Sequence, residues 1–193
     1  MEIFVDRKRF IFKKALRQRR RAFYFRFVMM YKKILTKEQV YQKLKHFCAY
    51  QDRCHNEVKE KAYSFGLRKT DVEELTSKLI EEDCLNEERF AKLFAGGKFR
   101  IKQWGRVKIK SELFQKRVSD YCIRKALQEI KEEDYINTLN KLAKKKWASI
   151  TGTGINQFVK MTKTRNFLLQ KGFESALIGD ALKKIKEKTK GAE

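Results

Sequence analysis

The sequence contains no proline and only nine glycines among its 193 residues. Proline breaks helices because its ring fixes φ and removes a backbone donor, and interior glycine weakens them. The scarcity of both therefore favours helices. The charged fraction, 37%, is high, which is typical of solvated helices with narrow apolar stripes. The composition predicts an all-α protein.

Long apolar runs are also missing. None reaches the roughly 20 residues that span a bilayer, and the basic residues 1–35 lack the apolar core and small-residue cleavage site of a signal peptide. Cysteines are few, and all lie within helical patterns: Cys48, Cys54, Cys84 and Cys122. We expect buried thiols in a cytoplasmic protein that does not enter a membrane.

Histidine is scarce, which limits the chemistry available to the chain. His46 and His55 lie near Cys48 and Cys54, but structural zinc sites usually use closely spaced cysteine pairs, and these cysteines are six apart. We expect no metal site. Adjacent glutamates such as Glu87-Glu88 are expected to interact with helix dipoles rather than to catalyse.

Nucleotide-binding loops of known spacing are absent as well. Gly152-Thr153-Gly154 has Gln157 where a dinucleotide loop has its third glycine, and Gly96-Gly97-Lys98 lacks the spacing and the hydroxyl residue of a phosphate loop. With only two histidines, no Ser/His/Asp or Cys/His set is persuasive. The sequence therefore predicts no enzyme and no cofactor.

Acidic residues are in short supply. The chain has 47 Lys and Arg against 24 Asp and Glu, a net charge of +23. A charge of this size indicates a polyanionic partner, which can be a nucleic acid, an acidic membrane surface or an acidic protein face, although it can also serve solubility alone.

Internal repetition is the clearest positive signal. Residues 114–130 align without a gap on residues 169–185, and six of the 17 pairs are identical. A fainter copy lies 51 residues upstream, where Leu67, Val72, Leu75 and Leu79 match Val118, Ile123, Ala126 and Ile130. Three units with a period near 50 residues predict a tandem-repeat protein.

The pattern divides the chain into an extension, three repeats and a tail. We expect residues 1–35 to form a basic, aromatic extension, 36–84, 85–131 and 132–187 to form three-helix repeats, and 188–193 to form a polar tail. The extension holds 12 Lys and Arg beside Phe23-Tyr24-Phe25-Arg26-Phe27. It either binds phosphates and bases or has no evolved role, with the true start at Met29 or Met30. In both cases we expect residues 1–28 to be dispensable for folding.

Apolar stripes place the helices within the repeats. In the first repeat we expect a buried face of Val40, Leu44 and Phe47, and a helix that stops at Gly66. In the second, Asn86 is the expected N-cap, followed by a stripe of Phe90, Leu93 and Phe94 that Gly96-Gly97 interrupts or loosens, and then by Val107, Leu113 and Phe114. In the third, Phe158 and Met161 belong to a helix that stops at Gly172.

A basic stretch in the second repeat is the candidate binding surface. Arg106, Lys110 and Arg117 have helical spacing, and Glu112 is the one acidic residue between Lys98 and Arg117. Trp104 is either a core anchor or an exposed contact residue. A second cluster follows in the third repeat. The candidate residues are Lys98, Arg100, Lys102, Trp104, Arg106, Lys108, Lys110, Lys116, Arg117, Lys144, Lys145 and Lys146.

The chain resembles the RecX family over roughly residues 37–186. The resemblance is strongest at Leu85-Asn86-Glu87-Glu88-Arg89-Phe90-Ala91 and at Trp104-Gly105-Arg106, continuing through Leu113 to Lys116. As family-motif residues with structural roles we single out Leu85, Asn86, Arg89, Phe90, Ala91, Gly105 and Leu113. The family pattern has glycine where this chain has Arg117, so we expect the turn there to be made differently.

The resemblance implies a curved array of three three-helix repeats that binds the groove of a RecA filament on DNA. It implies a monomeric, non-catalytic regulator that lowers RecA ATP hydrolysis, strand exchange and co-protease activity in DNA repair and the SOS response. The alternative is a helical-repeat protein that binds single- or double-stranded nucleic acid directly.

Overall fold

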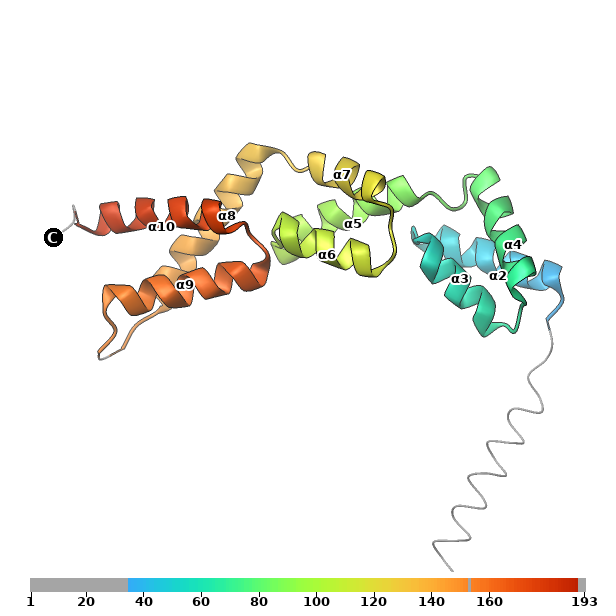
Figure 1. Ribbon diagram of the computed structural model, residues 1–193, viewed down its shortest axis with the longest axis horizontal. Coiled ribbons are helices and arrows are strands. Elements are labelled where there is room, and N and C mark those ends of the chain that lie inside the picture. Colours follow the sequence, from blue (N-terminus) through green and yellow to red (C-terminus); the bar gives the residue numbers. More distant parts are fainter. Residues whose placement is uncertain (1–34, 153, 191–193) are drawn as a thin grey trace, which may run out of the picture. The chain divides into compact units, whose positions relative to one another are not determined.

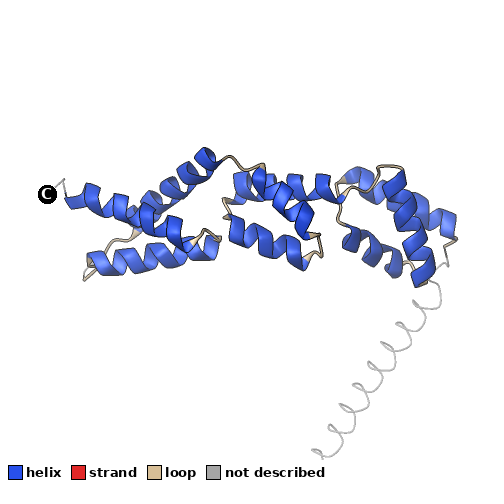
Figure 2. Cartoon of the chain, turned by 45° about the horizontal axis from the view of Figure 1, so that its top comes forward, coloured by secondary structure: helices blue, strands red, loops and turns tan. Residues whose placement is uncertain are grey.

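The computed structural model of the protein describes residues 35–152 and 154–190 (Figure 1). Every regular element in this part of the chain is a helix, and it holds no strand (Figure 2). The helices belong to one compact unit that begins at Lys37. Residues 1–34 lie outside the described residues, and with them the expectations about the basic extension and its aromatic patch.

The described helices form three consecutive groups of three. The first group is α2 (Lys37–Tyr50), α3 (His55–Ser64) and α4 (Lys69–Glu81). The second is α5 (Glu87–Lys102), α6 (Arg106–Gln115) and α7 (Asp120–Gln128), and the third is α8 (Glu132–Ser149), α9 (Gln157–Lys171) and α10 (Ser175–Lys190). Within each group every helix packs on the other two. The predicted fold of tandem three-helix repeats is confirmed. No helix among the described residues is long and apolar enough to cross a membrane.

The helix ends follow the local signals in the sequence. Asn86 caps α5, because its side-chain oxygen accepts a hydrogen bond from the backbone N–H of Arg89 at 3.0 Å. Asn156 caps α9 in the same way, with Val159 as the donor at 2.9 Å. Gly66 and Gly172 follow their helices with φ of 90° and 87°, the left-handed conformation that glycine adopts at little cost.

The buried faces differ in part from the predicted stripes. In α5 the buried side chains are Phe90, Ala91, Ala95 and Phe99, whereas Leu93 is 54% exposed. In α6 they are Ile109 and Leu113, and both Val107 and Phe114 are exposed. The alanines that complete the buried face of α5 are overlooked when only large apolar residues are counted. The predicted stripes therefore lay on helix faces that point partly toward solvent.

The first and third repeats show the same kind of error. Tyr41 and Cys48 complete the buried face of α2, and Phe47, which we had expected there, is half-buried. Phe158 of α9 is exposed, and the buried residues of that helix are Thr164 and Leu168. Cys84 is also half-buried rather than buried, although the other three cysteines are buried as predicted.

Gly96 and Gly97 do not interrupt α5, which continues from Glu87 to Lys102. An interior glycine costs a helix about 1 kcal/mol relative to alanine. Burial of Ala95 and Phe99 beside these glycines is large enough to offset that cost. Gly96 also leaves room for the guanidinium of Arg100, which lies 2.8 Å from where a Cβ would be.

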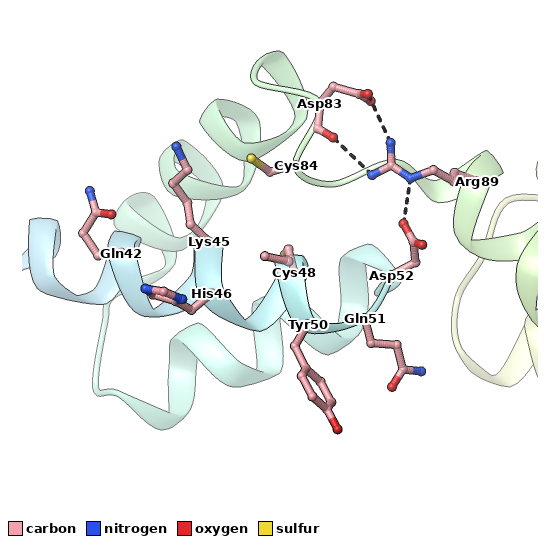
Figure 3. Close-up of a pocket in the computed structure, with 11 residues that line it drawn as sticks. Gln42, Lys45, His46, Cys48, Tyr50, Gln51, Asp52, Asp83, Cys84 and Arg89 are labelled. Carbon is pink, nitrogen blue, oxygen red and sulfur yellow. Dashed lines mark hydrogen bonds and ion pairs between the residues drawn. The ribbon is translucent and has the colours of Figure 1, made fainter.

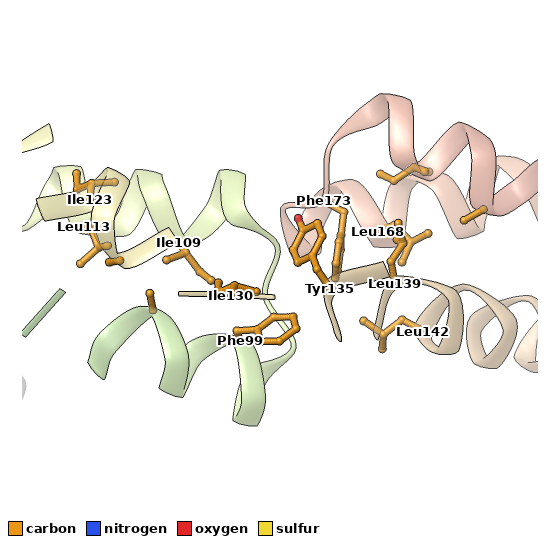
Figure 4. Packing of buried hydrophobic residues seen from close by; sticks show 14 of the residues in the cluster. Phe99, Ile109, Leu113, Ile123, Ile130, Tyr135, Leu139, Leu142, Leu168 and Phe173 are labelled. Carbon is orange, nitrogen blue, oxygen red and sulfur yellow. The ribbon is translucent and has the colours of Figure 1, made fainter. Parts of the chain in front are cut away.

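One hydrophobic core runs through the second and third repeats (Figure 4). Tyr135 of α8 lies between Phe99 of α5 and Phe173, with ring centroids 5.9 and 5.2 Å away. The first repeat contributes only Cys54 to this cluster. The second and third repeats therefore share a core, and the first is joined to them by other means.

Candidate binding surface of the second repeat and its seam with the third

Arg89 joins the first repeat to the second (Figure 3). Its Nε donates to Asp52 at 2.7 Å, and its other nitrogens donate to the carboxylate and the carbonyl of Asp83, both at 3.1 Å. The hydrogen bond to Asp52 raises the pKa of the guanidinium. A cavity of about 640 Å³ opens beside this cluster, lined by residues that include Cys48, Tyr50 and Cys84. These hydrogen bonds connect the start of α5 to the first repeat.

Gly105 joins the second repeat to the third. Its N–H donates to the carbonyl of Lys171 at 2.8 Å, and the N–H of Val107 donates to the carbonyl of Gly172 at 3.1 Å. The last carbonyls of α9 therefore satisfy the free N–H groups at the start of α6. A Cβ on Gly105 would lie 2.1 Å from the carbonyl oxygen of Gly172. Only glycine permits this approach of the two backbones.

Arg106 belongs to the same seam and not to an open basic surface. Its guanidinium lies 4.2 Å from the centroid of the Tyr135 ring, and its Nη2 donates to Glu132 at 2.7 Å and to the carbonyl of Ile130 at 3.2 Å. The Tyr135 hydroxyl accepts from the backbone N–H of Arg106 at 3.0 Å and donates to Glu174 at 2.5 Å. We had expected no acidic neighbour for Arg106, and this was wrong, because Glu132 lies after the stretch whose charges we counted. A binding role for Arg106 stays a prediction.

Trp104 is the centre of the surface that remains. Its ring is half-buried against the core, and the ammonium groups of Lys98 and Lys108 lie 5.0 and 4.6 Å from it. Lys98 also lies 5.0 Å from the ring of Phe94, and Lys116 lies 5.8 Å from that ring. We call Phe94, Lys98, Trp104, Lys108 and Lys116 the aromatic–basic surface. The Trp104 ring is therefore neither fully buried nor fully exposed, and its role as a contact residue stays a prediction.

Lys116 is partly neutralised. Its Nζ donates to Glu57 of the first repeat at 2.6 Å, and this hydrogen bond raises the pKa of the lysine. The expectation that no acidic group balances the basic stretch is therefore wrong at Lys116 as well as at Arg106. Both acidic partners come from neighbouring repeats, which the local charge count did not include.

The other candidates of the second repeat are dispersed. Arg100 lies back along α5 beside Gly96, and Lys102 is exposed near the end of the same helix. Lys110 is exposed on α6. Arg117 is not on α6 but follows it in a left-handed conformation, with φ of 59°. Arg117 therefore adopts the left-handed conformation that glycine adopts in the family pattern. Our expectation that the turn is made differently was wrong.

The cluster in the third repeat lies on both sides of α8. Lys144 lines a cavity of about 430 Å³ with Lys141 and Lys184. Lys145 and Lys146 line another, of about 300 Å³, with Gln103, Phe167 and Lys171. We call the second one the seam cavity, because its walls come from the second and third repeats.

Several of these residues were not predicted from the sequence pattern. Tyr135 was not singled out as a hydrogen-bonding partner of Arg106 and Glu174. Lys171 and Phe167 were not candidates at all. One signal for Lys171 was present, because the internal alignment pairs it with Lys116.

Comparison with known proteins extends these observations. A family model described as RecX, second three-helix domain, matches residues 86–127, and one described as RecX, third three-helix domain, matches residues 132–182. The regulatory protein RecX of Bacillus cytotoxicus is 28% identical over 158 residues, which are 80% of this chain and 57% of that protein. That of Clostridium perfringens is 30% identical over 122 residues, 63% of this chain and 57% of that protein. The chain thus spans little more than half the length of these curated relatives.

Solved structures share the fold. The crystal structure of RecX from Lactobacillus salivarius superimposes with a TM-score of 0.71 at 23% identity, covering 78% of this chain and 96% of that one. A second crystal structure, of a regulatory protein RecX, gives a TM-score of 0.67 at 21% identity, with 75% and 71% covered.

Proposed function

The chain belongs to the RecX family, and from that premise we propose that it is a regulator of RecA without catalytic activity of its own. It binds the groove of the RecA–DNA filament as a monomer in the cytoplasm. Binding lowers RecA ATP hydrolysis, strand exchange and co-protease activity during DNA repair and the SOS response.

The aromatic–basic surface is the observation that carries this proposal. Lys98 and Lys108 lie against the ring of Trp104, and neither forms a salt bridge to a carboxylate among the described residues. Their charge is therefore available to an anionic partner, and Trp104 adds a large, partly rigid contact area. Indole rings beside cations are common at the centres of interfaces.

Direct binding of nucleic acid is the second candidate function. A ring flanked by lysines also suits a single strand, because bases stack on aromatic side chains while lysines contact the phosphates. The two functions differ in one requirement. A RecA regulator binds tightly only when the filament is present, whereas a nucleic-acid-binding protein binds DNA alone with the same affinity.

Charge reversal tests the proposal. We expect the triple variant Lys98→Glu, Lys108→Glu, Lys110→Glu to inhibit RecA-dependent ATP hydrolysis on single-stranded DNA at least tenfold less well, because several favourable charge contacts become repulsive. The fold should survive, since Lys110 is exposed, the half-buried Lys98 and Lys108 form no salt bridge among the described residues, and such charges contribute less than about 1 kcal/mol each. Arg106 is left unchanged because it stabilises the seam.

The matched control reverses three exposed lysines elsewhere, Lys43, Lys69 and Lys183. It has the same net charge as the triple variant, so a general loss of positive charge affects both alike. If the two variants inhibit equally well, the aromatic–basic surface is not the binding surface. If the parent has no effect on RecA but binds DNA alone, the second candidate function replaces the first.

A further inference from the structure

The seam cavity gathers positive charge without an acidic counterpart. Lys145, Lys146 and Lys171 line it together with Gln103, Leu142 and Phe167, and no carboxylate is among its lining residues. Its volume of about 300 Å³ lies at the lower end of the range for small-ligand sites. Such a cavity fits one small anion, or one unit of a larger polyanion.

Two of the ammonium groups lie near one aromatic ring. Lys146 and Lys171 lie 5.4 and 5.8 Å from the centroid of the Phe167 ring. A half-buried aromatic wall screens their positive charge less than water does. The cavity therefore favours occupancy by negative charge.

The cavity is also preorganised. The Nζ of Lys171 donates to the carbonyl of Lys102 at 3.0 Å, and the backbone hydrogen bond from Gly105 to Lys171 fixes the end of α9 against the start of α6. Gln103 is the left-handed C-cap of α5, with φ of 53° and ψ of 46°, and it lines the cavity at the end of that helix.

We propose that the seam cavity binds the phosphate of a nucleotide. Lys145, Lys146 and Lys171 contact the phosphate oxygens, and the amide of Gln103 supplies a further hydrogen bond. Phe167 and Leu142 form the apolar wall against which the sugar or base lies. The phosphate belongs either to a free nucleotide or to a nucleic-acid strand, because the chemistry that the cavity recognises is the same.

This proposal goes beyond the regulation of RecA and does not depend on it. The cavity binds phosphate whether or not the protein acts on a filament. Its test therefore contains no RecA, and a failure here leaves the proposed function untouched.

Direct titration tests the site. Pyrophosphate, ATP and a short oligothymidylate are titrated into the full chain at low salt by calorimetry. The triple variant Lys145→Gln, Lys146→Gln, Lys171→Gln should bind at least one of them about tenfold or more weakly than the parent. Its salt slope for the oligothymidylate should fall by about 2, since each phosphate contact on a single strand contributes about 0.7.

The control is charge-matched and uses the other side of α8. The variant Lys141→Gln, Lys144→Gln, Lys184→Gln removes the same charge from the cavity between α8 and α10. It should keep the parent's affinity within about twofold, less than the counterion effect of a full phosphate contact. Tighter binding of ATP than of the oligothymidylate identifies a free nucleotide as the ligand, and the reverse order identifies a strand. Equal losses in the two variants, or no binding by the parent to any probe, overturn the proposal.

Discussion

The hydrogen atom that Gly105 has in place of a side chain lets the backbones of the second and third repeats approach each other closely. Replacing it with the methyl group of Gly105→Ala would place a carbon 2.1 Å from the carbonyl oxygen of Gly172. The two backbones must separate, and the hydrogen bond from Gly105 to Lys171 must break. We expect a loss of about 3 kcal/mol or more in the free energy of unfolding, measured by urea denaturation.

Gly97→Ala is the matched control for that substitution. Gly97 lies inside α5, and a Cβ there would have no atom within 4 Å. Alanine should therefore stabilise the helix by about 0.5–1 kcal/mol. A loss of stability at Gly97, or a neutral effect at Gly105, would contradict the packing described for these two positions.

Arg117 carries backbone strain that glycine would relieve. Its φ of 59° places it in the left-handed region, which costs a residue with a Cβ roughly 1 kcal/mol. Its side chain is exposed, so little packing is lost on truncation. We expect Arg117→Gly to raise the free energy of unfolding by up to about 1 kcal/mol, seen as a higher urea midpoint. Arg117→Ala keeps the strain and should show no such gain.

Tyr135 makes stability depend on pH in the alkaline range. Burial raises the pKa of its hydroxyl, and the hydrogen bond to Glu174 raises it further. The folded protein thus keeps the proton at pH values where the unfolded chain, with a pKa of about 10, loses it. The stabilisation is complete below about pH 10 and decreases as the pH rises above that value. Tyr135→Phe should be less stable at neutral pH and should show a smaller alkaline decrease than the parent.

At the scale of the helix, sequence pattern located most elements but not their faces. Asn86, Gly66 and Gly172 marked helix ends correctly, because caps act through bonds to backbone groups a few residues away. The buried face of α5 could not be read from Leu93 and Phe94, since burial depends on which helix packs opposite. Ala91 and Ala95 give no signal as large apolar residues, yet they are fully buried.

The candidate site was predictable only in part, for a related reason. Four of the five residues of the aromatic–basic surface lie between Lys98 and Lys116, and local sequence singled them out as candidates. The fifth, Phe94, was expected in the apolar stripe of α5. Arg106 is neutralised by Glu132, and Lys116 is neutralised by Glu57. The two glutamates lie 26 and 59 residues away, and only the folded arrangement of the repeats brings the partners together.

The junction between the first and second repeats differs from the junction between the second and third. This difference predicts which repeat unfolds locally first. The second and third repeats share a core and backbone hydrogen bonds, whereas the first is attached largely through ion pairs such as Lys116 with Glu57. Lys116→Met removes the hydrogen bond to the half-buried Glu57 carboxylate, which keeps only Arg53 of its own repeat at 3.8 Å, and this costs about 1–3 kcal/mol. Hydrogen exchange should accelerate in α3 and remain unchanged in α9. Equal acceleration in both helices would mean that the repeats open as one unit.

At the scale of the whole molecule, the net charge of +23 acts on folding and on binding with opposite signs. Positive charges repel one another in the folded protein, and salt screens that repulsion. The same charges attract a polyanionic partner. Salt weakens that attraction, because binding releases counterions from the polyanion and their release is less favourable at a higher salt concentration. Stability and binding should therefore respond to salt in opposite directions.

Raising NaCl from about 50 to about 200 mM, where the Debye length falls to about 7–8 Å, should raise the melting temperature while weakening inhibition of RecA ATP hydrolysis. The melting temperature is followed by circular dichroism and the inhibition by its half-maximal protein concentration, in the same buffers. The Lys98→Glu, Lys108→Glu, Lys110→Glu variant has a net charge that is lower by six, so both responses should be smaller in it. A melting temperature that falls with salt would show that ion pairs such as Arg89 with Asp52 outweigh the general repulsion, and that the charge of this chain stabilises its fold as well as its contacts.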